Sequence, residues 1–364
     1  MSLFDRTLEE LARNKALRES GKDICIPSPF KRMGVEWPGI QKGTYLLVSA
    51  NQKVGKTQIS DYVFVYHPVE FVRNNNTNIK IKIFDFNLEM SKESKIRQAI
   101  VHRIYTKTGK IFTTRQLDSI YQDSILSDDI LKFIEADREW YEFFLDRVTY
   151  IDDVRNGTGI YKYIRSFFES NGHYEYKKVM FTNDDGTQEE KTLIDRYIPD
   201  DPDLFVIIKV DNINLLTPEK GQTLFDAIGH FSSNYCVKMR NRWGAIPIII
   251  QQQTLAKEGN ESIKMGRTRA TADGLADNKA TSKDCNVFMG LYSPFRNSEP
   301  TFYKYDIIRL KDHYRNFYIE FDRNGNSCET SLYFHGAVNY FKELPRADEM
   351  TNDIYNNIHE RMKP

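Results

Sequence analysis

The amino-acid sequence predicts an α/β fold with a mostly parallel central sheet flanked by helices. Short apolar runs at 45–48, 204–210 and 245–250 have the length and continuity of strands buried on both faces. Stretches with helical spacing of apolar residues separate these runs, which is the alternation that a parallel sheet requires. Later runs follow one another without long helices, so we expect antiparallel strands at the C-terminal edge. These later runs are 287–292, 302–310, 317–322 and 331–336.

Composition limits the class of protein. The chain has 364 residues, 40% of them hydrophobic, which is enough for a full core. No stretch approaches the about 20 apolar residues that span a bilayer, and the charged N-terminus is unlike a signal peptide, so we expect a cytoplasmic protein. Basic and acidic residues both number 51, so any affinity for nucleic acid has to come from a local basic surface. The four cysteines form no CxxC pair, which argues against disulfides and a zinc site.

The chain begins with an amphipathic segment, 4–18, in which leucines recur at helical spacing. This helix either packs on its own domain or docks on a neighbouring subunit, and the sequence leaves both open. A loop rich in proline and glycine then leads to the first core strand. We place the helix in 1–22, one large domain in 23–342 and a charged, peripheral tail in 343–364.

The segment ANQKVGKT, 50–57, follows the first strand and fits a phosphate-binding loop with alanine at the first glycine position. In such a loop, backbone N–H groups and a helix N-terminus converge on the anion. Gly55 allows the close turn, Lys56 reaches the β- and γ-phosphates, and the Thr57 hydroxyl holds Mg²⁺. We therefore predict ATP and Mg²⁺ as ligands. The predicted nucleotide-binding residues are Ala50, Asn51, Gln52, Lys53, Val54, Gly55, Lys56, Thr57 and Gln58.

The second strand predicts a catalytic carboxylate. After a helix at 59–72, broken near Pro68, the strand at 79–86 leads into Asn-Leu-Glu-Met-Ser. Open α/β sheets place their chemistry at the carboxyl ends of strands next to the phosphate loop. Glu89 would there polarise the water that attacks the γ-phosphate. The alternative is that Glu89 only caps the next helix, 92–107.

The middle of the chain predicts supporting elements. We expect helices over 111–144 and 160–170 and a short strand at 148–151. A polar hairpin over 174–197, turning at 183–186, is interpreted as an insertion on the sheet edge, and its function cannot be inferred from the sequence.

The apolar run 204–216 contains Asp211, which we expect to bind the water shell of Mg²⁺ from a strand beside the phosphate-loop strand. A helix at 222–242 and a strand at 245–253 follow. Three glutamines close this strand, and a buried amide without partners costs about 1–3 kcal/mol. We therefore expect Gln253, or a neighbour, to sense the γ-phosphate.

A basic loop follows the glutamines. It carries Lys257, Lys264, Arg267 and Arg269, with no acidic residue between 263 and 272. Such a loop is either a solvated connection or an arm that grips the phosphates of a nucleic acid.

The order of these parts resembles the RecA-like motor domain of DnaB-type replicative helicases, including those of phages, over roughly 24–334. NLEMS is similar to that family's catalytic-glutamate motif, VDNINLL to its metal-binding aspartate motif, and PIIIQQQT to its sensor-glutamine strand. These motifs assign Glu89, Asp211 and Gln253. The resemblance implies a RecA-like P-loop fold, ATP hydrolysis, and rings of six subunits with ATP between neighbours. It also implies that basic residues of the adjacent subunit reach the γ-phosphate.

Some features depart from the family pattern. Its paired lysine and arginine fall near Lys311 and His313, so we assign these roles to Lys311 and Arg315. The family's N-terminal collar domain is missing, and the first helix is similar to its linker helix that docks on the adjacent subunit. A primase or loader would come from another chain.

Three functional hypotheses remain open. The first is an ATP-driven helicase whose basic loop moves along single-stranded DNA during replication. The second is a RecA-like recombination or repair ATPase that forms filaments on DNA. The third is a nucleotide-dependent scaffold or loader with little turnover, against which the set of Lys56, Glu89 and Asp211 argues.

Overall fold

The computed structural model describes residues 2–122, 125–254 and 268–364. Its main sheet has nine strands in the order β15-β14-β13-β10-β3-β9-β8-β4-β5. The pairs from β10 to β5 are parallel, and the pairs from β15 to β10 are antiparallel. The predicted fold class, a mostly parallel sheet with antiparallel strands at the C-terminal edge, is therefore confirmed.

The strands of the main sheet are β3 (Leu46–Ala50), β4 (Lys80–Asn87), β5 (Val148–Ile151), β8 (Leu204–Asp211), β9 (Ile246–Gln252), β10 (Val287–Tyr292), β13 (Tyr314–Asp322), β14 (Glu329–His335) and β15 (Tyr340–Glu343). Two-stranded sheets are formed by β1 (Ile26–Pro27) with β2 (Gly39–Ile40), β6 (Gly172–Thr182) with β7 (Gln188–Pro199), and β11 (Thr301–Phe302) with β12 (Tyr305–Asp306).

The strand order corrects one expectation. β9 lies between the phosphate-loop strand β3 and β8, and β4 lies beyond β8. Neither strand with a predicted acidic residue is therefore a neighbour of β3. Helical crossovers allow a parallel sheet to skip positions, and the apolar pattern carries no information about which strands pair.

The helices are α1 (Leu3–Glu19), α2 (Lys56–Asp61), α3 (His67–Asn74), α4 (Lys92–Thr108), α5 (Thr114–Leu117), α6 (Asp128–Ala136), α7 (Arg138–Arg147), α8 (Gly157–Ser170), α9 (Leu224–His230), α10 (Val237–Trp243), α12 (Ala280–Asp284), α13 (Ile307–Leu310), α14 (Asn352–Asn356) and α15 (Ile358–Arg361). A π-helical turn, Tyr62–Tyr66, joins α2 to α3, so the chain stays helical through Pro68. A second one, Phe231–Cys236, joins α9 to α10. In place of the single helix predicted over 111–144, the described part of this segment contains three shorter helices, α5, α6 and α7.

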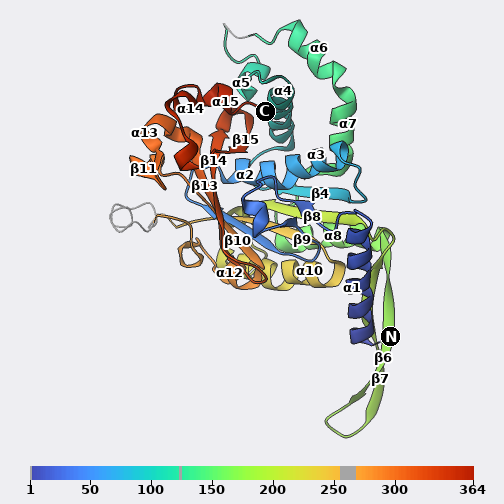
Figure 1. Cartoon of the computed structure of the whole chain (residues 1–364). Coiled ribbons are helices and arrows are strands. Elements are labelled where there is room, and N and C mark those ends of the chain that lie inside the picture. Colours follow the sequence, from blue (N-terminus) through green and yellow to red (C-terminus); the bar gives the residue numbers. More distant parts are fainter. Residues whose placement is uncertain (1, 123–124, 255–267) are drawn as a thin grey trace.

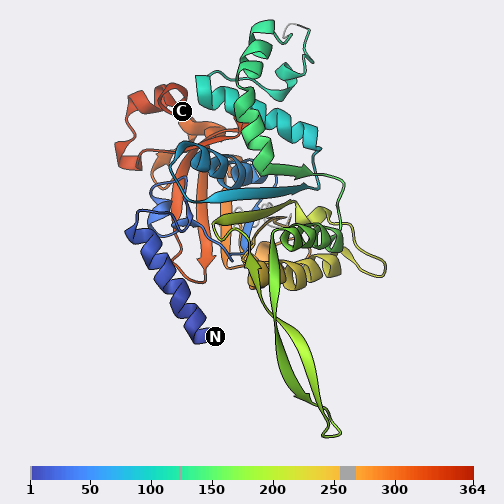
Figure 2. The same ribbon diagram turned by 90° about the vertical axis from the view of Figure 1, so that its right-hand side faces the viewer.

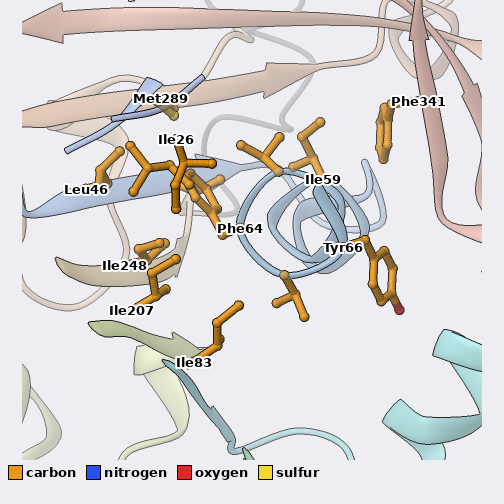
Figure 3. Close-up of a cluster of buried hydrophobic side chains, with 14 of the residues drawn as sticks. Ile26, Leu46, Ile59, Phe64, Tyr66, Ile83, Ile207, Ile248, Met289 and Phe341 are labelled. Carbon is orange, nitrogen blue, oxygen red and sulfur yellow. The ribbon is translucent and has the colours of Figure 1, made fainter. Parts of the chain in front are cut away.

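Helices cover both faces of the sheet (Figure 1). Alternate residues of β3 enter two cores: Leu46 and Val48 pack on the side of α2, and Leu47 packs on the opposite side. Figure 3 shows the first core, where Ile207 and Ile248 lie with Leu46 near the helix that carries Ile59 and Phe64. This alternation decides which side chains of each strand face α2.

Two segments project from this body. The β6–β7 ribbon extends away from the sheet (Figures 1 and 2), and the N-terminal part of α1 contacts it through Arg6 and Asp195. Ion pairs Arg6–Asp195 and Arg13–Asp203 hold α1 against its own chain, at 2.5 and 3.1 Å. The apolar side chains of Leu8 and Leu11 on α1 remain exposed.

The C-terminal tail is not peripheral, which corrects the sequence prediction. Ile358 and Met362 are buried in a third core with Tyr105 and Tyr333. The expectation failed because only a few tail residues are apolar, and the surface that they cover is supplied by distant segments. Within the described ranges, no helix has both the length and the apolar composition to cross a membrane.

Candidate functional site

The phosphate-loop sequence forms a tight turn between β3 and α2. Gly55 has φ of 108°, in the region that favours glycine, and α2 starts at the next residue. The loop and the first residues of α2 line the same cleft, which is the arrangement that anion binding at a helix N-terminus requires. Ala50 is fully buried at the end of β3 and has a strand conformation, which alanine adopts as readily as the glycine that this motif usually has there.

A cleft of about 410 Å³ lies against this loop. Its lining brings together Lys56, Thr57, Glu89 and Asp211, which the sequence assigns to the nucleotide site. Lys56 is buried and its Nζ donates to the Asn51 carbonyl at 3.2 Å. Glu89 is exposed, whereas Asp211 is buried. A second cavity, of about 350 Å³, shares Gln58 and Gln98 with the cleft.

The pairing of β4 with β8 places the two acidic residues near each other. Asn87 is the register partner of Asp211, and the N–H of Leu88 donates to the Asp211 carbonyl at 2.7 Å. The loop that carries Glu89 therefore starts from a backbone bonded to Asp211. This explains how both acids line one cleft although β9 separates β8 from β3.

The oxygen atoms in the cleft suit Mg²⁺. Asp211 Oδ1 is buried and has no hydrogen-bond partner within the described part of the chain. Thr57 lines the same cleft, and hydroxyl and carboxylate oxygens are the ligands that Mg²⁺ prefers. Asp211 Oδ1 therefore has the charge and the free lone pairs to bind a cation or a water molecule of its hydration shell.

Five charged side chains form a buried charge cluster beneath the cleft: Asp61, Asp85, Lys95, Lys209 and Asp211. Lys209 Nζ lies 2.9 Å from Asp61 Oδ1, 3.1 Å from Asp85 Oδ1 and 3.5 Å from Asp211 Oδ2. Burial lowers the pKa of Lys209, but these carboxylates outweigh burial and hold it well above its ordinary value. Lys209 is therefore an ammonium ion in the protein interior.

The two other carboxylates of the cluster differ. Burial raises the pKa of Asp85 despite the attraction of Lys209. Burial also acts on Asp61, but Lys209 and Lys95, which lies 2.6 Å from Asp61 Oδ2, lower its pKa. Asp61 is closer than Asp85 to both lysines. The lysines therefore lower the pKa of Asp61, whereas burial prevails at Asp85 and raises its pKa.

The glutamines that end β9 face different directions. Gln252 lines the cleft. Gln253 is buried outside the cleft lining, where its side chain donates to Ser49 Oγ at 2.8 Å and accepts from the Thr271 N–H at 3.2 Å. Of the two residues, Gln252 is thus the one beside the phosphate loop, and Gln253 connects β3 to the segment after the basic loop. The sequence could not separate them, because adjacent strand residues point to opposite faces.

Arg315 does not lie where a residue that reaches a neighbouring subunit would lie. It is fully buried, its Nε donates to the Val54 carbonyl at 2.6 Å, and its guanidinium covers the Phe334 ring at 4.5 Å. It therefore anchors the phosphate loop of its own chain. Lys311 is exposed in the turn Lys311–His313, which precedes the strand that carries Arg315, so only the lysine of the predicted pair is available to a partner.

Of the four basic residues assigned to DNA, Lys257, Lys264 and Arg267 lie outside the described residues. Arg269 is described, and it is engaged within its own domain. Its guanidinium pairs with Glu329 at 2.9 Å and covers the Tyr318 ring at 3.9 Å. This placement does not fit a free cation at a DNA surface; the partners come from β13 and β14, which the local sequence cannot reveal.

Sequence reasoning missed Lys209, Asp85 and Asp61. The available signal was a charged residue inside an otherwise apolar strand, as in LFVIIKVD and IFDF. A charge buried in a strand needs a partner, because desolvation of an unpaired charge is costly. That signal predicts an ion pair but not which elements supply it.

Known structures share this architecture. No protein-family model matches the chain, and no curated protein matches it. A solved structure described as an ATPase domain is similar with a TM-score of 0.67 and 15% identity, covering 95% of this chain and 100% of that one. A second, described as "The Structure Of A DnaB-Like Replicative Helicase And Its Interactions With Primase", has a TM-score of 0.64 and 16% identity, covering 93% of this chain and 66% of that one. The chain therefore has the fold of a DnaB-like helicase ATPase domain, as the sequence resemblance implies.

Proposed function

We propose that this chain hydrolyses ATP with Mg²⁺ and uses the energy to move along single-stranded DNA, as a helicase of the DnaB type. The observation that carries the proposal is the shared cleft of Lys56, Thr57, Glu89 and Asp211 at the phosphate loop. Phosphoryl transfer needs positioning and charge stabilisation more than covalent chemistry, and this set supplies both.

Each residue has a distinct role in this proposal. The N-terminus of α2 and Lys56 bind the β- and γ-phosphates, and Glu89 orients the attacking water from the cleft wall. Thr57 and Asp211 would hold Mg²⁺, which neutralises charge on the phosphates when bound. Gln252 lines the cleft and is the better placed glutamine to respond to the γ-phosphate.

The assembly is part of the proposal. Arg315 is buried and bonded to the phosphate loop of its own chain, so it does not reach the γ-phosphate of a neighbouring subunit in this conformation. We therefore assign the contact to the γ-phosphate of the adjacent subunit to the exposed Lys311. We propose a ring in which the exposed face of α1 docks on a neighbour. The second structural neighbour is described together with primase, so a primase supplied by another chain is a proposed partner.

Single-stranded DNA would contact the basic loop through Lys257, Lys264 and Arg267. Replacing Lys264 and Arg267 with alanine is expected to weaken binding and to reduce its salt dependence, because each lost phosphate contact lowers the slope by about 1. Arg269→Ala is the matched control, since Arg269 pairs with Glu329 and should affect binding less. Equal losses in both variants would contradict the assignment.

The direct test of catalysis compares Lys56→Ala and Glu89→Gln with the wild type. Lys56→Ala should lower ATP hydrolysis by about 100-fold or more, since a phosphate charge is left without its cation. Glu89→Gln should abolish turnover but keep nucleotide binding, because Glu89 acts on water. Turnover retained in both variants would overturn the ATPase proposal.

The test of assembly is imaging with an ATP analogue and single-stranded DNA, together with a strand-displacement assay. Closed six-membered rings with displacement support the helicase. Open helical filaments without displacement would instead support the recombination-type ATPase.

A further inference from the structure

Lys209 is the centre of the buried charge cluster, and its contacts link three separate elements. Its ammonium group lies 2.9 Å from Asp61 on α2, 3.1 Å from Asp85 on β4 and 3.5 Å from Asp211 on β8. Each of these side chains is buried, so solvent does not screen the interactions.

The same three elements carry the groups of the proposed site. Lys56 and Thr57 begin α2, Glu89 follows β4, and Asp211 ends β8. One ammonium ion is thus in contact with the three elements that carry or precede Lys56, Glu89 and Asp211. Because the interior is close-packed, a shift of any one element would change the Lys209 contacts of the other two.

The cluster also has an unbalanced charge. Asp61, Asp85 and Asp211 are three carboxylates, and Lys95 and Lys209 are two ammonium groups, which leaves one negative charge. Lys95 contacts Asp61 and lies 4.0 Å from Asp85, whereas Lys209 alone of the two pairs with Asp211. The contact is to Oδ2, and Oδ1 is left without a partner in the described part of the chain.

We propose that Lys209 is a positioning residue: it holds Asp211 by Oδ2 so that Oδ1 faces the cation, and it sets Asp211 relative to the phosphate-loop helix through Asp61 and Asp85. This inference rests on the proposed function, because it assigns Asp211 to Mg²⁺. The excess negative charge of the cluster is then matched by the bound cation.

Two double variants separate positioning from simple stabilisation. Lys209→Met/Asp85→Asn removes one cation and one anion and leaves Lys95, Asp61 and Asp211. Lys95→Met/Asp61→Asn removes the other ion pair and leaves Lys209, Asp85 and Asp211. Both variants keep the same cluster charge, but only the first removes the contact to Asp211.

The readout is the affinity for a fluorescent ADP analogue, measured with Mg²⁺ and with EDTA. In Lys209→Met/Asp85→Asn, the Mg²⁺-dependent gain in affinity should fall by about 10–100-fold, the size of effect typical of residues that orient a metal ligand. The affinity in EDTA should stay unchanged, because the phosphate loop is intact. The control variant should keep most of the gain, because Lys209 still contacts Asp85 and Asp211 there, and kcat/KM for ATP with Mg²⁺ should fall far more in the first variant than in the control.

An unchanged Mg²⁺-dependent gain in the folded Lys209→Met/Asp85→Asn protein would overturn the inference. If circular dichroism shows that this variant does not fold, Lys209→Gln/Asp85→Asn decides: its neutral amide leaves Asp211 without the ion pair to residue 209, so the gain should fall, and an unchanged gain overturns the inference. Wild-type protein with no Mg²⁺-dependent gain would overturn the proposed function as well. A wild-type gain that Asp211→Asn abolishes and Lys209→Met/Asp85→Asn retains would overturn only the role of Lys209.

Discussion

Lys209 and Arg315 are two fully buried basic side chains near the phosphate loop, and their positive charges are neutralised in different ways. Lys209 lies among three carboxylates, Asp61, Asp85 and Asp211, and they hold its pKa well above the ordinary value despite burial. Among the described residues, Arg315 has one ion pair, with the half-exposed Asp312, and burial lowers its pKa to about 10. Its remaining partners include the carbonyls of Val54 and Tyr314.

The number of neighbouring carboxylates thus decides whether the pKa of a buried base ends above its ordinary value, as for Lys209, or below it, as for Arg315. His102 extends the series. Within the described ranges it has no carboxylate in hydrogen-bond contact, its Nδ1 donates to the Val338 carbonyl at 3.0 Å, and burial lowers its pKa to about 4. Burial therefore lowers the pKa of His102, which has no such partner, and of Arg315, which has one, whereas the three carboxylates around Lys209 raise its pKa.

Replacing Lys209 alone with methionine should give the largest effect on stability. It leaves three buried carboxylates with one lysine, and breaking a buried pair costs about 3–5 kcal/mol of unfolding free energy. Urea unfolding measures this loss. Adding Asp85→Asn should restore much of the stability, because the second change removes one unpaired anion; no recovery would contradict the pairing.

The second test uses pH. The folded-state pKa of His102, about 4, lies below its ordinary value of 6.5, so the unfolded chain binds the proton more readily. The contribution to stability is present above pH 6.5 and is lost as pH falls toward 4, by about 3 kcal/mol in total. Urea unfolding across this range should show a smaller loss for His102→Phe than for wild type. Parallel pH profiles would exclude His102 as a source of the acid sensitivity.

Arg315→Met should cost less than the loss of Lys209, about 1–3 kcal/mol, because its partners are mainly neutral carbonyls. The Val54 carbonyl would lose its donor, the phosphate loop would loosen, and the KM for ATP should rise. Arg296→Met is the matched control, since Arg296 pairs with the same Asp312 at 3.5 Å, whereas the Val54 carbonyl accepts from Arg315. An unchanged KM in Arg315→Met would show that the anchor is dispensable.

Lys311→Ala should have the smallest effect on stability, within about 0.5 kcal/mol, because the side chain is exposed. Its effect should appear only in the assembled protein, as a loss of ATP hydrolysis with unchanged monomer stability. Mixing Lys311→Ala with Glu89→Gln subunits tests this: activity regained in the mixture supports a role across the subunit interface. Activity of the unmixed Lys311→Ala variant equal to that of wild type would contradict it.

The sequence predicted much of the fold because the relevant signals are local. Continuous apolar runs identified the first residues of the strands that begin at Leu204 and Val287, and the helix expected over 92–107 is observed as Lys92–Thr108. The phosphate-loop motif identified Lys56 and Thr57, which the structure places in one cleft with Glu89 and Asp211. The catalytic roles themselves stay predictions.

Other features depended on contacts between distant segments. Strand order is a property of the crossovers, so the sequence wrongly placed Asp211 and Glu89 on strands beside β3. Arg315 could be assigned from spacing, but only packing against Val54 and Phe334 reveals that it serves its own loop.

The element types, the phosphate loop and the positions of the acidic residues can be read from the sequence, since each is encoded within a few neighbouring positions. The partners of the buried charges emerge only in the folded chain, because the electrostatic energy of Lys209 depends on carboxylates from α2, β4 and β8 that are far apart in the sequence. Local patterns specify which groups are present, and distances in three dimensions specify what those groups can do.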